Sequence, residues 1–345
     1  MNIAVLCGGL SMERDVSLKS GAVIAEALRA NGHNVAVIDS FFGYTGDYTD
    51  PAEIYTRSLS GLSAEISSEV PDLEKIKASR RQNNDSRIGD NLIEVCRAAD
   101  IVFLGLHGAD GEDGRLQAAF DIAGVKYTGT GYLGSGIAMN KEAAKKLFKA
   151  NGILTPEGRR INVNDADKSY PCLPCVVKPK SSGSSVGTSI AHTPEEYEKA
   201  LEFGFKYEDD VLVERYIKGR EVDVGVLCGK ALPPIEIIPK SGFFDYKNKY
   251  QDGMTDEICP ADLSGDVTAK LMDAAERVFK ALYLEVYARM DFIIEGTTGD
   301  VYCLEANTLP GMTPASLLPK EALAAGIKYE ELCELIVNRS LEKYE

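Results

Sequence analysis

Residues 301–320 read VYCLEANTLPGMTPASLLPK, and this stretch joins a strand to a turn rich in hydrogen-bond donors. The apolar run at its start predicts a β-strand that carries Glu305 and Asn307 two positions apart. Both side chains then point to the same face, roughly 6.6 Å apart along the strand. The Pro-Gly pair at 310–311 predicts a turn with an open backbone amide, and neutral donors follow as far as Ser316. The stretch therefore predicts a face for metal-bound phosphate, followed by an anion-binding turn.

The strand before this stretch carries a further acid. Residues 287–294 alternate in polarity, so Arg289 and Asp291 share a face. The glycine-containing turn at 296–300 returns the chain antiparallel and places Asp291 beside the two polar side chains of the next strand. Such oxygens suit Mg²⁺ that bridges phosphates, and Zn²⁺ is disfavoured because neither His nor Cys is among them. The alternative is a hairpin whose polar face only meets water.

Residues 175–190, CVVKPKSSGSSVGTSI, predict a strand, a loop of small residues and a returning strand. Lys178 follows two valines, and a buried lysine is costly unless its ammonium group reaches water or an anion. The loop at 181–187 offers backbone amides and hydroxyls suited to covering phosphates. It is not a P-loop, because the Gly-Lys-Ser/Thr ending is absent. A plain hairpin turn is the alternative interpretation of the loop.

Two later segments extend this unit. Residues 211–217 predict a strand with Glu214 in its middle, and the turn at 228–230 predicts an antiparallel hairpin. Residues 239–259 are rich in glycine, tyrosine, lysine and aspartate. A stretch of that length without regular structure usually serves a binding site.

The N-terminus predicts a βαβ unit, with strands at 3–7 and 34–38 and a helix at 15–30. Nicotinamide dinucleotide binding is disfavoured because the turn GGLSME lacks the spaced glycines of that fingerprint. Glu13 also places a carboxylate where a pyrophosphate would approach. This carboxylate either stabilises the start of the helix through the macrodipole or binds an ammonium group.

The open α/β pattern resumes after a polar, turn-rich insertion at about 41–90. A helix at 91–98 and a strand at 101–106 lead to the glycine-rich loop at 107–114. A single His at a strand end is commonly structural. His107, however, leads a loop at the carboxyl end of a strand, where open α/β sheets bind ligands. We therefore count it as a candidate for the site.

A new unit begins near residue 130. The preceding helix ends at Gly124, and residues 125–127 predict a short strand. A helix is expected over 137–150, and its lysines are interpreted as a solvent-exposed face, with the exception of Lys141.

The composition limits the classes of partner. The 345 residues suit two or three domains, and the formal charge of -15 argues against nucleic acid or an anionic membrane as a partner. The eight cysteines include the pair Cys172 and Cys175 in CLPC, which could be redox-active but is better explained as apolar filling in a reducing cytoplasm. We expect no export segment and no membrane span, because no apolar run reaches about 18 residues.

Six motifs taken together resemble those of the D-alanine:D-alanine ligases, a family of the ATP-grasp superfamily. They are GGLSMERDVS at 8–17, LHGADGEDG at 106–114, VKPKSSGSSVG at 177–187, FFDYKNKY at 243–250, RMD at 289–291 and LEANTLPGMT at 304–313. The resemblance implies an α/β fold, α+β in parts, with three domains at 1–129, 130–214 and 215–345. The first is an open α/β sheet domain that contains the insertion, and the other two hold ATP between them.

The resemblance also assigns residues. The ATP-binding residues would be Lys141, Lys178, Glu214, Ile217, Glu221, Phe243 and Lys249. Two Mg²⁺ ions, with Mn²⁺ as a possible substitute, would be bound by Asp291, Glu305 and Asn307. The catalytic group would be Glu13, Ser184, Tyr250, Arg289 and Gly311, and the amino acids would bind at Glu13, His107, Ser316 and Leu317.

The implied reaction joins two D-alanine molecules through an acylphosphate, releases ADP and phosphate, and supplies peptidoglycan synthesis. Tyr250 favours an amine as the second substrate, because relatives that use D-lactate tend to lack this tyrosine. The chain departs from the pattern in the insertion, in Lys180-Ser181-Ser182 and in Ala288. D-Alanine:D-serine ligation, another ATP-grasp ligation and a catalytically silent nucleotide-binding protein remain as alternatives. A homodimer formed through the N-terminal domain is the family expectation.

Overall fold

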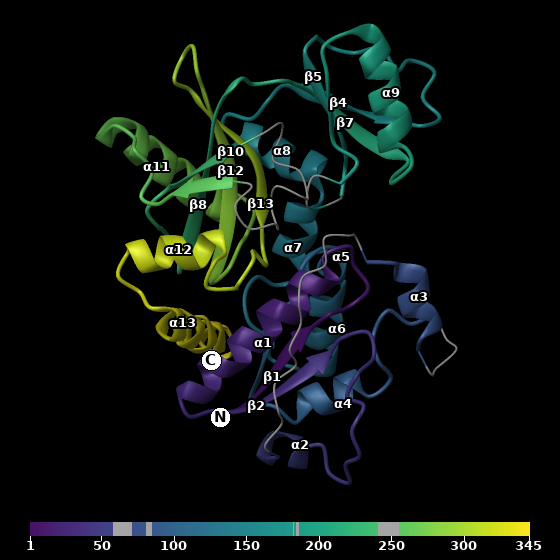
Figure 1. The fold of residues 1–345 in the computed structure, drawn as a ribbon, viewed down its shortest axis with the longest axis vertical. Helices are drawn as coiled ribbons and strands as arrows, with labels where there is room; N and C mark the ends of the chain where they lie inside the picture. The colour runs from purple at the N-terminus through teal and green to yellow at the C-terminus, as the bar shows by residue number, and fades with distance from the viewer. Residues whose placement is uncertain (58–70, 81–84, 182, 184–185, 241–254) are drawn as a thin grey trace.

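The computed structural model describes residues 1–57, 71–80, 85–181, 183, 186–240 and 255–345. These residues are arranged around three β-sheets (Figure 1). The first sheet is parallel and lies at the bottom of the view, whereas the other two are antiparallel and stand above it. The fold is therefore α/β in its first unit and α+β in the other two, as the sequence predicts.

Three parallel strands form the first sheet, in the order β2-β1-β3. They are β1 (Asn2–Cys7), β2 (Asn34–Asp39) and β3 (Ile101–Leu104). Helix α1 (Arg14–Ala30) connects β1 to β2 and buries Val16, Ile24 and Leu28. The predicted βαβ opening is confirmed, because the apolar residues recur with helical spacing and bury one face of α1.

Five short helices complete the first unit. They are α2 (Glu53–Thr56), α3 (Leu73–Ala78), α4 (Leu92–Arg97), α5 (Ala109–Glu112) and α6 (Arg115–Ala123). Helix α6 ends as predicted at Gly124, whose φ of 68° lies in the left-handed region that favours glycine. The predicted strand at 125–127 is reduced to a single parallel bridge between Val102 and Tyr127.

The single helix expected over 137–150 is wrong. The structure has two helices there, α7 (Tyr132–Met139) and α8 (Lys141–Ala150). Asn140 separates them with an extended backbone, and its side chain accepts a hydrogen bond from the Ala143 amide. An asparagine that caps a new helix interrupts the α-helical hydrogen bonds, so α8 begins as a separate helix.

The second sheet has the strand order β4-β7-β5-β6 and lies at the upper right of Figure 1. Its strands are β4 (Gly158–Asn162), β5 (Cys175–Pro179), β6 (Ser189–Ala191) and β7 (Asp210–Arg215). Helix α9 (Pro194–Gly204) packs on it, with Tyr197 and Leu201 in a core that includes Val177 and Val211. The strands predicted around Lys178 and Glu214 are thus neighbours.

The third sheet has the order β11-β10-β8-β12-β13, and β9 pairs with β8. The strands are β8 (Gly219–Leu227), β9 (Lys230–Ala231), β10 (Ile235–Pro239), β11 (Thr255–Ile258), β12 (Tyr287–Glu295) and β13 (Val301–Asn307). Both predicted hairpins are confirmed, and Asp291 lies directly opposite Glu305. Helix α11 (Gly265–Ala281) packs against this sheet.

The C-terminal helices connect the third sheet to the first. They are α12 (Leu317–Ala324), α13 (Tyr329–Leu341) and the 3₁₀ helix η1 (Glu342–Tyr344). Helix α13 lies beside α1 (Figure 1), and Leu332 and Ile336 belong to the core of the first sheet. Phe148 of α8 shares a core with the third sheet, so the apolar cores cross the expected boundaries. The three-domain division remains a prediction.

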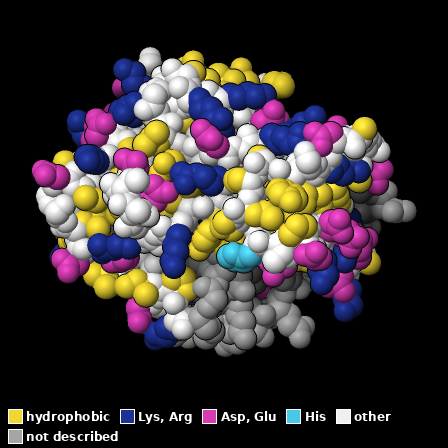
Figure 2. All heavy atoms as spheres, turned by 90° about the horizontal axis from the view of Figure 1, so that it is seen from above, with side chains coloured by type: hydrophobic (Ala, Val, Ile, Leu, Met, Phe, Trp, Pro, Cys, Tyr) yellow, Lys and Arg dark blue, Asp and Glu magenta, His cyan; other side chains and the backbone are white. Residues whose placement is uncertain are grey.

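The charges are mixed on the face seen from above. Figure 2 shows Lys and Arg side chains interspersed with Asp and Glu side chains there, with apolar side chains between them. Among the described helices, none combines the length and apolar character that crossing a membrane requires.

Candidate active site

A cavity lies between the second and third sheets and is lined by residues from both. Many of the residues implied for ATP and metal binding meet in it. They are Lys141, Lys178, Glu214, Ile217, Glu221, Asp291 and Glu305. The structure thus brings together side chains from α8, β5, β7, β8, β12 and β13 in the expected place.

Glu214 stands between two lysines at one wall of this cavity. The Lys178 Nζ atom is 3.1 Å from Glu214 Oε2, and the Lys145 Nζ atom is 3.0 Å from Oε1. Burial would raise the pKa of Glu214, but the two ammonium groups outweigh burial and hold this pKa below its usual value. Burial likewise opposes the charge on Lys178, yet Glu214 and Glu305 raise the pKa of this lysine. The predicted phosphate lysine is therefore charged and held in place.

Lys145 was assigned to the solvent-exposed face of its helix, and this prediction is wrong. It is 8 % exposed, and its Nζ atom also donates to Thr155 Oγ1 at 2.6 Å. Burial lowers its pKa to about 8. The available signal was its spacing of four residues from Lys141, which puts both lysines on one face of the helix.

Lys141 is the first residue of α8 and connects two walls of the cavity. Its Nζ atom is 3.4 Å from Glu305 Oε2, and its backbone amide donates to the Lys180 carbonyl oxygen at 3.1 Å. The break at Asn140 positions this lysine at the start of its helix. Lys141 therefore lies close to the acid on β13 as well as to the segment that follows β5.

The acids of β12 and β13 form a network with Arg289. The Arg289 Nε atom lies 2.9 Å from Asp223 Oδ2 and 2.9 Å from Asp291 Oδ1. Asn307 donates its amide to both oxygens of Asp291 at 3.1 Å. Burial raises the pKa of Asp223 well above its usual value, and the nearby Asp291 raises it further. Asp223 was not singled out from the sequence, where it is one acid in a mostly apolar strand.

The donor atoms fit a hard cation. Asp291 and Glu305 offer carboxylate oxygens from facing positions, and Asn307 offers an amide, which are ligands that Mg²⁺ accepts. Within the described ranges, no three His, Cys, Asp or Glu side chains are grouped to hold a metal. Asp291 is engaged by Arg289 and Asn307, and Glu305 by Lys141, so an ion would replace these contacts. The magnesium assignment remains a prediction.

Glu13 lies where the first unit meets the loop that follows β5. A β-carbon at Gly108 would be 2.9 Å from Glu13 Oε2, and one at Gly183 would be 3.1 Å from the same atom. Ser11 orients the turn, because its hydroxyl donates to the His107 carbonyl and accepts from the Glu13 amide. Glu13 is thus adjacent to the residue that precedes the predicted Ser184.

His107 connects the first unit to the segment that follows β13. Its Nδ1 atom is 2.9 Å from the Leu309 carbonyl oxygen, and its Nε2 atom is 2.9 Å from Ser20 Oγ. Burial lowers the pKa of His107, so the ring is neutral and donates from Nδ1 to the carbonyl. Both ring nitrogens have protein partners, and direct substrate binding by His107 remains a prediction.

Glu112 is an acid of the same loop that sequence reasoning did not select. Its Oε1 atom accepts from the Gly108 amide at 3.4 Å. Burial raises its pKa well above the usual value, and the carboxylate of Glu13 raises it further. The motif LHGADGEDG contains the residue, but its three acids and three glycines give no reason to prefer Glu112 over Asp110.

The turn after β13 closes on itself through Ser316. The Ser316 Oγ atom lies 2.8 Å from Thr313 Oγ1 and accepts from the Thr313 amide at 3.1 Å. A β-carbon at Gly311 would be 2.9 Å from this oxygen, so the turn needs a residue without a side chain. Ser316 precedes α12, whose first residue is Leu317, and free amides at a helix start suit an anion.

Four predicted residues lie outside the described part of the chain. They are Ser184, Phe243, Lys249 and Tyr250. Their proposed contacts with ATP and with Glu13 remain predictions.

Two antiparallel sheets around a cavity with buried lysines and facing acids define an ATP-grasp enzyme. Residues 2–130 match the family described as D-ala D-ala ligase N-terminus, and residues 155–338 match the one described as D-ala D-ala ligase C-terminus. The chain belongs to the D-alanine–D-alanine ligase family.

Curated relatives and solved structures match this chain over nearly its whole length. A D-alanine–D-alanine ligase of Pediococcus pentosaceus is 43 % identical over 343 residues, which are 98 % of this chain and 97 % of the relative. One from Halalkalibacterium halodurans is 39 % identical, covering 99 % and 100 %. The ligase of Bacillus anthracis complexed with ATP has a TM-score of 0.76 at 31 % identity, covering 99 % and 98 %. The VanG D-Ala:D-Ser ligase of Enterococcus faecalis has a TM-score of 0.72 at 27 % identity, covering 98 % of each chain.

Proposed function

We propose that this chain joins two D-alanine molecules to D-alanyl-D-alanine with ATP, releases ADP and phosphate, and supplies peptidoglycan precursor synthesis. The observation that carries the proposal is the cavity in which Lys141 and Lys178 face Asp291 and Glu305. Membership of the ligase family, with relatives of that name at up to 43 % identity, supports the substrate assignment.

In the first step, the carboxylate of one D-alanine attacks the γ-phosphorus of ATP and forms an acylphosphate. Lys141 and Lys178 would hold the phosphates, and Glu214, Ile217 and Glu221 would contact adenine and ribose. Phosphoryl transfer of this kind depends mainly on positioning and on neutralising charge. The oxygens of Asp291, Glu305 and Asn307 would hold two Mg²⁺ ions, or Mn²⁺, which supply part of that neutralisation when bound.

In the second step, the amine of the other D-alanine attacks the acylphosphate carbonyl, and phosphate leaves. Arg289 and the Gly311 amide would stabilise the tetrahedral oxyanion. Glu13, with Ser184 and Tyr250, would receive the ammonium group of the first substrate. Ser316 and Leu317 would bind the carboxylate of the second substrate.

Phosphate release tests the proposal. Purified protein with Mg²⁺ and ATP should release phosphate only when D-alanine is added, and D-alanyl-D-alanine should accumulate with it. Phosphate release that follows another carboxylate, and not D-alanine, would contradict the proposal.

Glu305→Gln removes one carboxylate beside Lys141, and we expect it to lower turnover by about 10²-fold or more while the circular dichroism spectrum is unchanged. Full activity of this variant would remove the metal assignment.

D-Alanyl-D-serine synthesis is the second candidate. The VanG D-Ala:D-Ser ligase of Enterococcus faecalis matches 98 % of this chain. Its identity of 27 % is lower than the 43 % of the Pediococcus pentosaceus D-alanine–D-alanine ligase and the 31 % of the Bacillus anthracis one, so the first proposal is preferred. Competition between D-alanine and D-serine, followed by identification of the dipeptides, separates the two.

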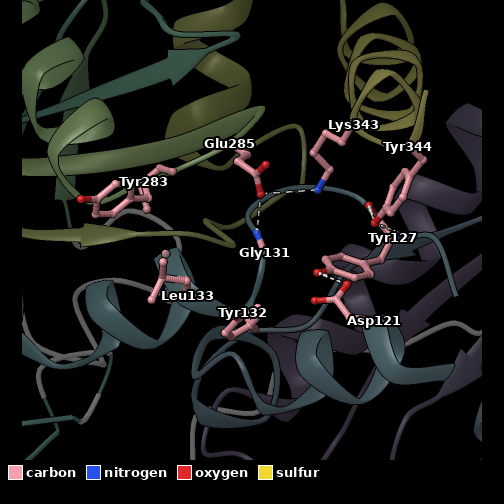
Figure 3. A pocket seen from close by; sticks show the side chains of 11 residues that line it. Asp121, Tyr127, Gly131, Tyr132, Leu133, Tyr283, Glu285, Lys343 and Tyr344 are labelled. Carbon is pink, nitrogen blue, oxygen red and sulfur yellow. Dashed lines mark hydrogen bonds and ion pairs between the residues drawn. The ribbon is translucent and has the colours of Figure 1, made fainter. Parts of the chain in front are cut away.

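We also propose a homodimer. An exposed apolar patch, which we define as Tyr132, Leu133 and Tyr283, lines one pocket with exposed fractions of 55 %, 51 % and 61 %. Tyr132 and Leu133 line a pocket, and Figure 3 shows them on one side of it, with Tyr127 and Tyr344 on another. Aromatic and aliphatic side chains gathered in this way are typical of protein interfaces. The patch adjoins the N-terminal unit, where the homodimer is expected.

We propose a cytoplasmic location. All eight cysteines are free, and Cys7, Cys96, Cys175, Cys303 and Cys333 are buried. Reduced, buried cysteines used as apolar filling are typical of a reducing compartment.

A further inference from the structure

Glu321 is a fully buried acid with no part in the reaction described above. It lies in α12, one helical turn after Leu317, and is 0 % exposed. A buried carboxyl group costs stability unless it is paired or neutral. The presence of Glu321 in this mostly apolar helix therefore needs an explanation.

The carboxyl group of Glu321 fills a gap in the third sheet. Strand β8 pairs with β9 at Val226 and with β10 at Asp223, and between these pairs the opposite chain runs through Leu232, Pro233 and Pro234. The Gly225 amide lies opposite this interruption. Glu321 Oε1 accepts a hydrogen bond from that amide at 2.7 Å, in place of a strand carbonyl.

Close packing makes this contact specific. A β-carbon at Gly225 would be 2.8 Å from Glu321 Oε2 and 2.6 Å from Leu318 Cδ1. A glycine is therefore needed on β8 for α12 to approach this closely. The helix and the strand are joined by one hydrogen bond and by the contact of Leu318 with the strand backbone.

The contact between Glu321 and Gly225 connects two parts of the candidate active site. Gly225 is the cross-strand partner of Arg289, and the other end of the contact is the helix that begins at Leu317. The position of α12 against β8 thus sets the distance between the proposed carboxylate-binding turn at Ser316 and the proposed oxyanion donor Arg289.

The surroundings favour the neutral acid. Burial raises the pKa of Glu321 to about 8, the hydrogen bond from the Gly225 amide and the Arg289 guanidinium oppose this, and Asp291 adds to it. Asp223, from β8, faces the same guanidinium. Among the described residues, neither Glu321 Oε2 nor Asp223 Oδ1 has a hydrogen-bond partner.

We infer that Glu321 is a positioning residue that fixes α12 against β8 and so aligns the second amino acid with Arg289. The inference rests on the proposed function for its catalytic consequence. Its structural part, the hydrogen bond from Gly225, stands independently of that function.

Three variants test it. Glu321→Gln keeps a neutral acceptor of the same shape, Glu321→Met keeps the volume without an acceptor, and Glu321→Asp keeps the acid but shortens its reach. Leu323→Gln, on the exposed side of the same helix, is the control, since Leu323 is 63 % exposed. Rates of phosphate release are measured against D-alanine and against ATP, and hydrogen exchange is followed in the peptide that contains Gly225.

We expect the Met and Asp variants to raise the KM for D-alanine about tenfold or more, with the KM for ATP changed by less than about twofold. Exchange at Gly225 should accelerate in both. The Gln and Leu323→Gln variants should match the wild type in all three measurements. Should the Met variant fail to fold, the Asp and Gln variants decide by the same criteria.

Three results would overturn the inference, and the first two concern the Met and Asp variants. One is unchanged exchange at Gly225 in a folded Met or Asp variant, and the other is an equal loss of D-alanine and ATP affinity. Loss of D-alanine affinity in the Gln variant would also contradict it. A wild-type protein that does not respond to D-alanine would instead refute the proposed function, and the exchange measurement would still test the contact.

Discussion

Glu214 shows how a single buried charge organises the nucleotide cavity. It is 3 % exposed and receives Lys178 on one oxygen and Lys145 on the other. A buried acid with two cations leaves a net positive charge at the wall where the phosphates of ATP are proposed to bind. The pair of lysines is therefore both a support for the fold and a source of the field that an anionic ligand meets.

Removal of Lys145 tests this arrangement. We expect Lys145→Met to lower the free energy of unfolding by up to about 3 kcal/mol, because the buried Glu214 then keeps only one of its two cations, Lys178. The KM for ATP should rise, since Glu214 would then draw Lys178 towards itself. Lys146→Met is the matched control. Lys146 is exposed and pairs only with Glu142 at the surface, so the expected loss is below about 1 kcal/mol. Urea unfolding and ATP titration of both variants provide the measurements, and equal losses would contradict the assignment.

Glu321 also predicts how stability depends on pH. Its pKa is about 8 in the folded chain, against an ordinary value of 4.5. Between these two pH values the folded state keeps a proton that the unfolded state has lost, so stability falls as the pH rises and levels off above about 8. Asp223 and Glu112, whose pKa values are also raised, contribute in the same direction.

The variant Glu321→Gln cannot titrate, so its stability should fall less steeply across this window. Urea unfolding at several pH values between about 5 and 8 measures the difference. Parallel curves for the variant and the wild type would show that Glu321 is ionised in the folded chain.

At the level of elements, the break between α7 and α8 determines where Lys141 lies. Asn140 accepts the Ala143 amide at 3.1 Å and so starts α8 directly before the lysine. A continuous helix would carry Lys141 in its middle and not at its first position. The cap therefore has a local effect on stability and a distant effect on the nucleotide site.

Asn140→Ala separates these two effects. We expect a loss of about 1 kcal/mol from the missing cap and a severalfold rise in the KM for ATP from the displaced Lys141. Thr193→Ala is the matched control, because Thr193 caps α9 by accepting the Glu196 amide at 3.2 Å. The control should lose similar stability and leave the KM unchanged. An unchanged KM for ATP in the Asn140→Ala variant would show that the cap does not affect the nucleotide site.

The sequence predicted those elements whose pattern is local. Alternating polarity predicted β12 and β13, and with them the meeting of Asp291 and Glu305. It could not reveal that Lys145 is buried, because helical spacing defines a face but not what covers it. The interruption at Asn140 was missed because apolar residues continue on both sides of it. The role of α13 depends on contacts across the whole chain, which no local pattern contains.

For the whole molecule, the exposed patch of Tyr132, Leu133 and Tyr283 predicts association. We expect the wild type to sediment at twice the 37.4 kDa of the chain, and the double variant Tyr132→Ser with Leu133→Ser to sediment as a monomer. Phe203→Ser, which changes an exposed aromatic residue of α9, should leave the dimer intact. Analytical ultracentrifugation distinguishes the outcomes, and a double variant that remains dimeric would place the interface elsewhere.

Helix α13 completes the core of the first sheet, although it is synthesised much later than the strands of that sheet. Asn31 of the first unit donates to the Glu330 carbonyl across 299 positions, and Leu332 and Ile336 complete the core around β1. At ordinary rates of translation, about 15 to 60 seconds separate the synthesis of these two ends. The first sheet is synthesised before α13, so part of its apolar surface stays uncovered until α13 has been made.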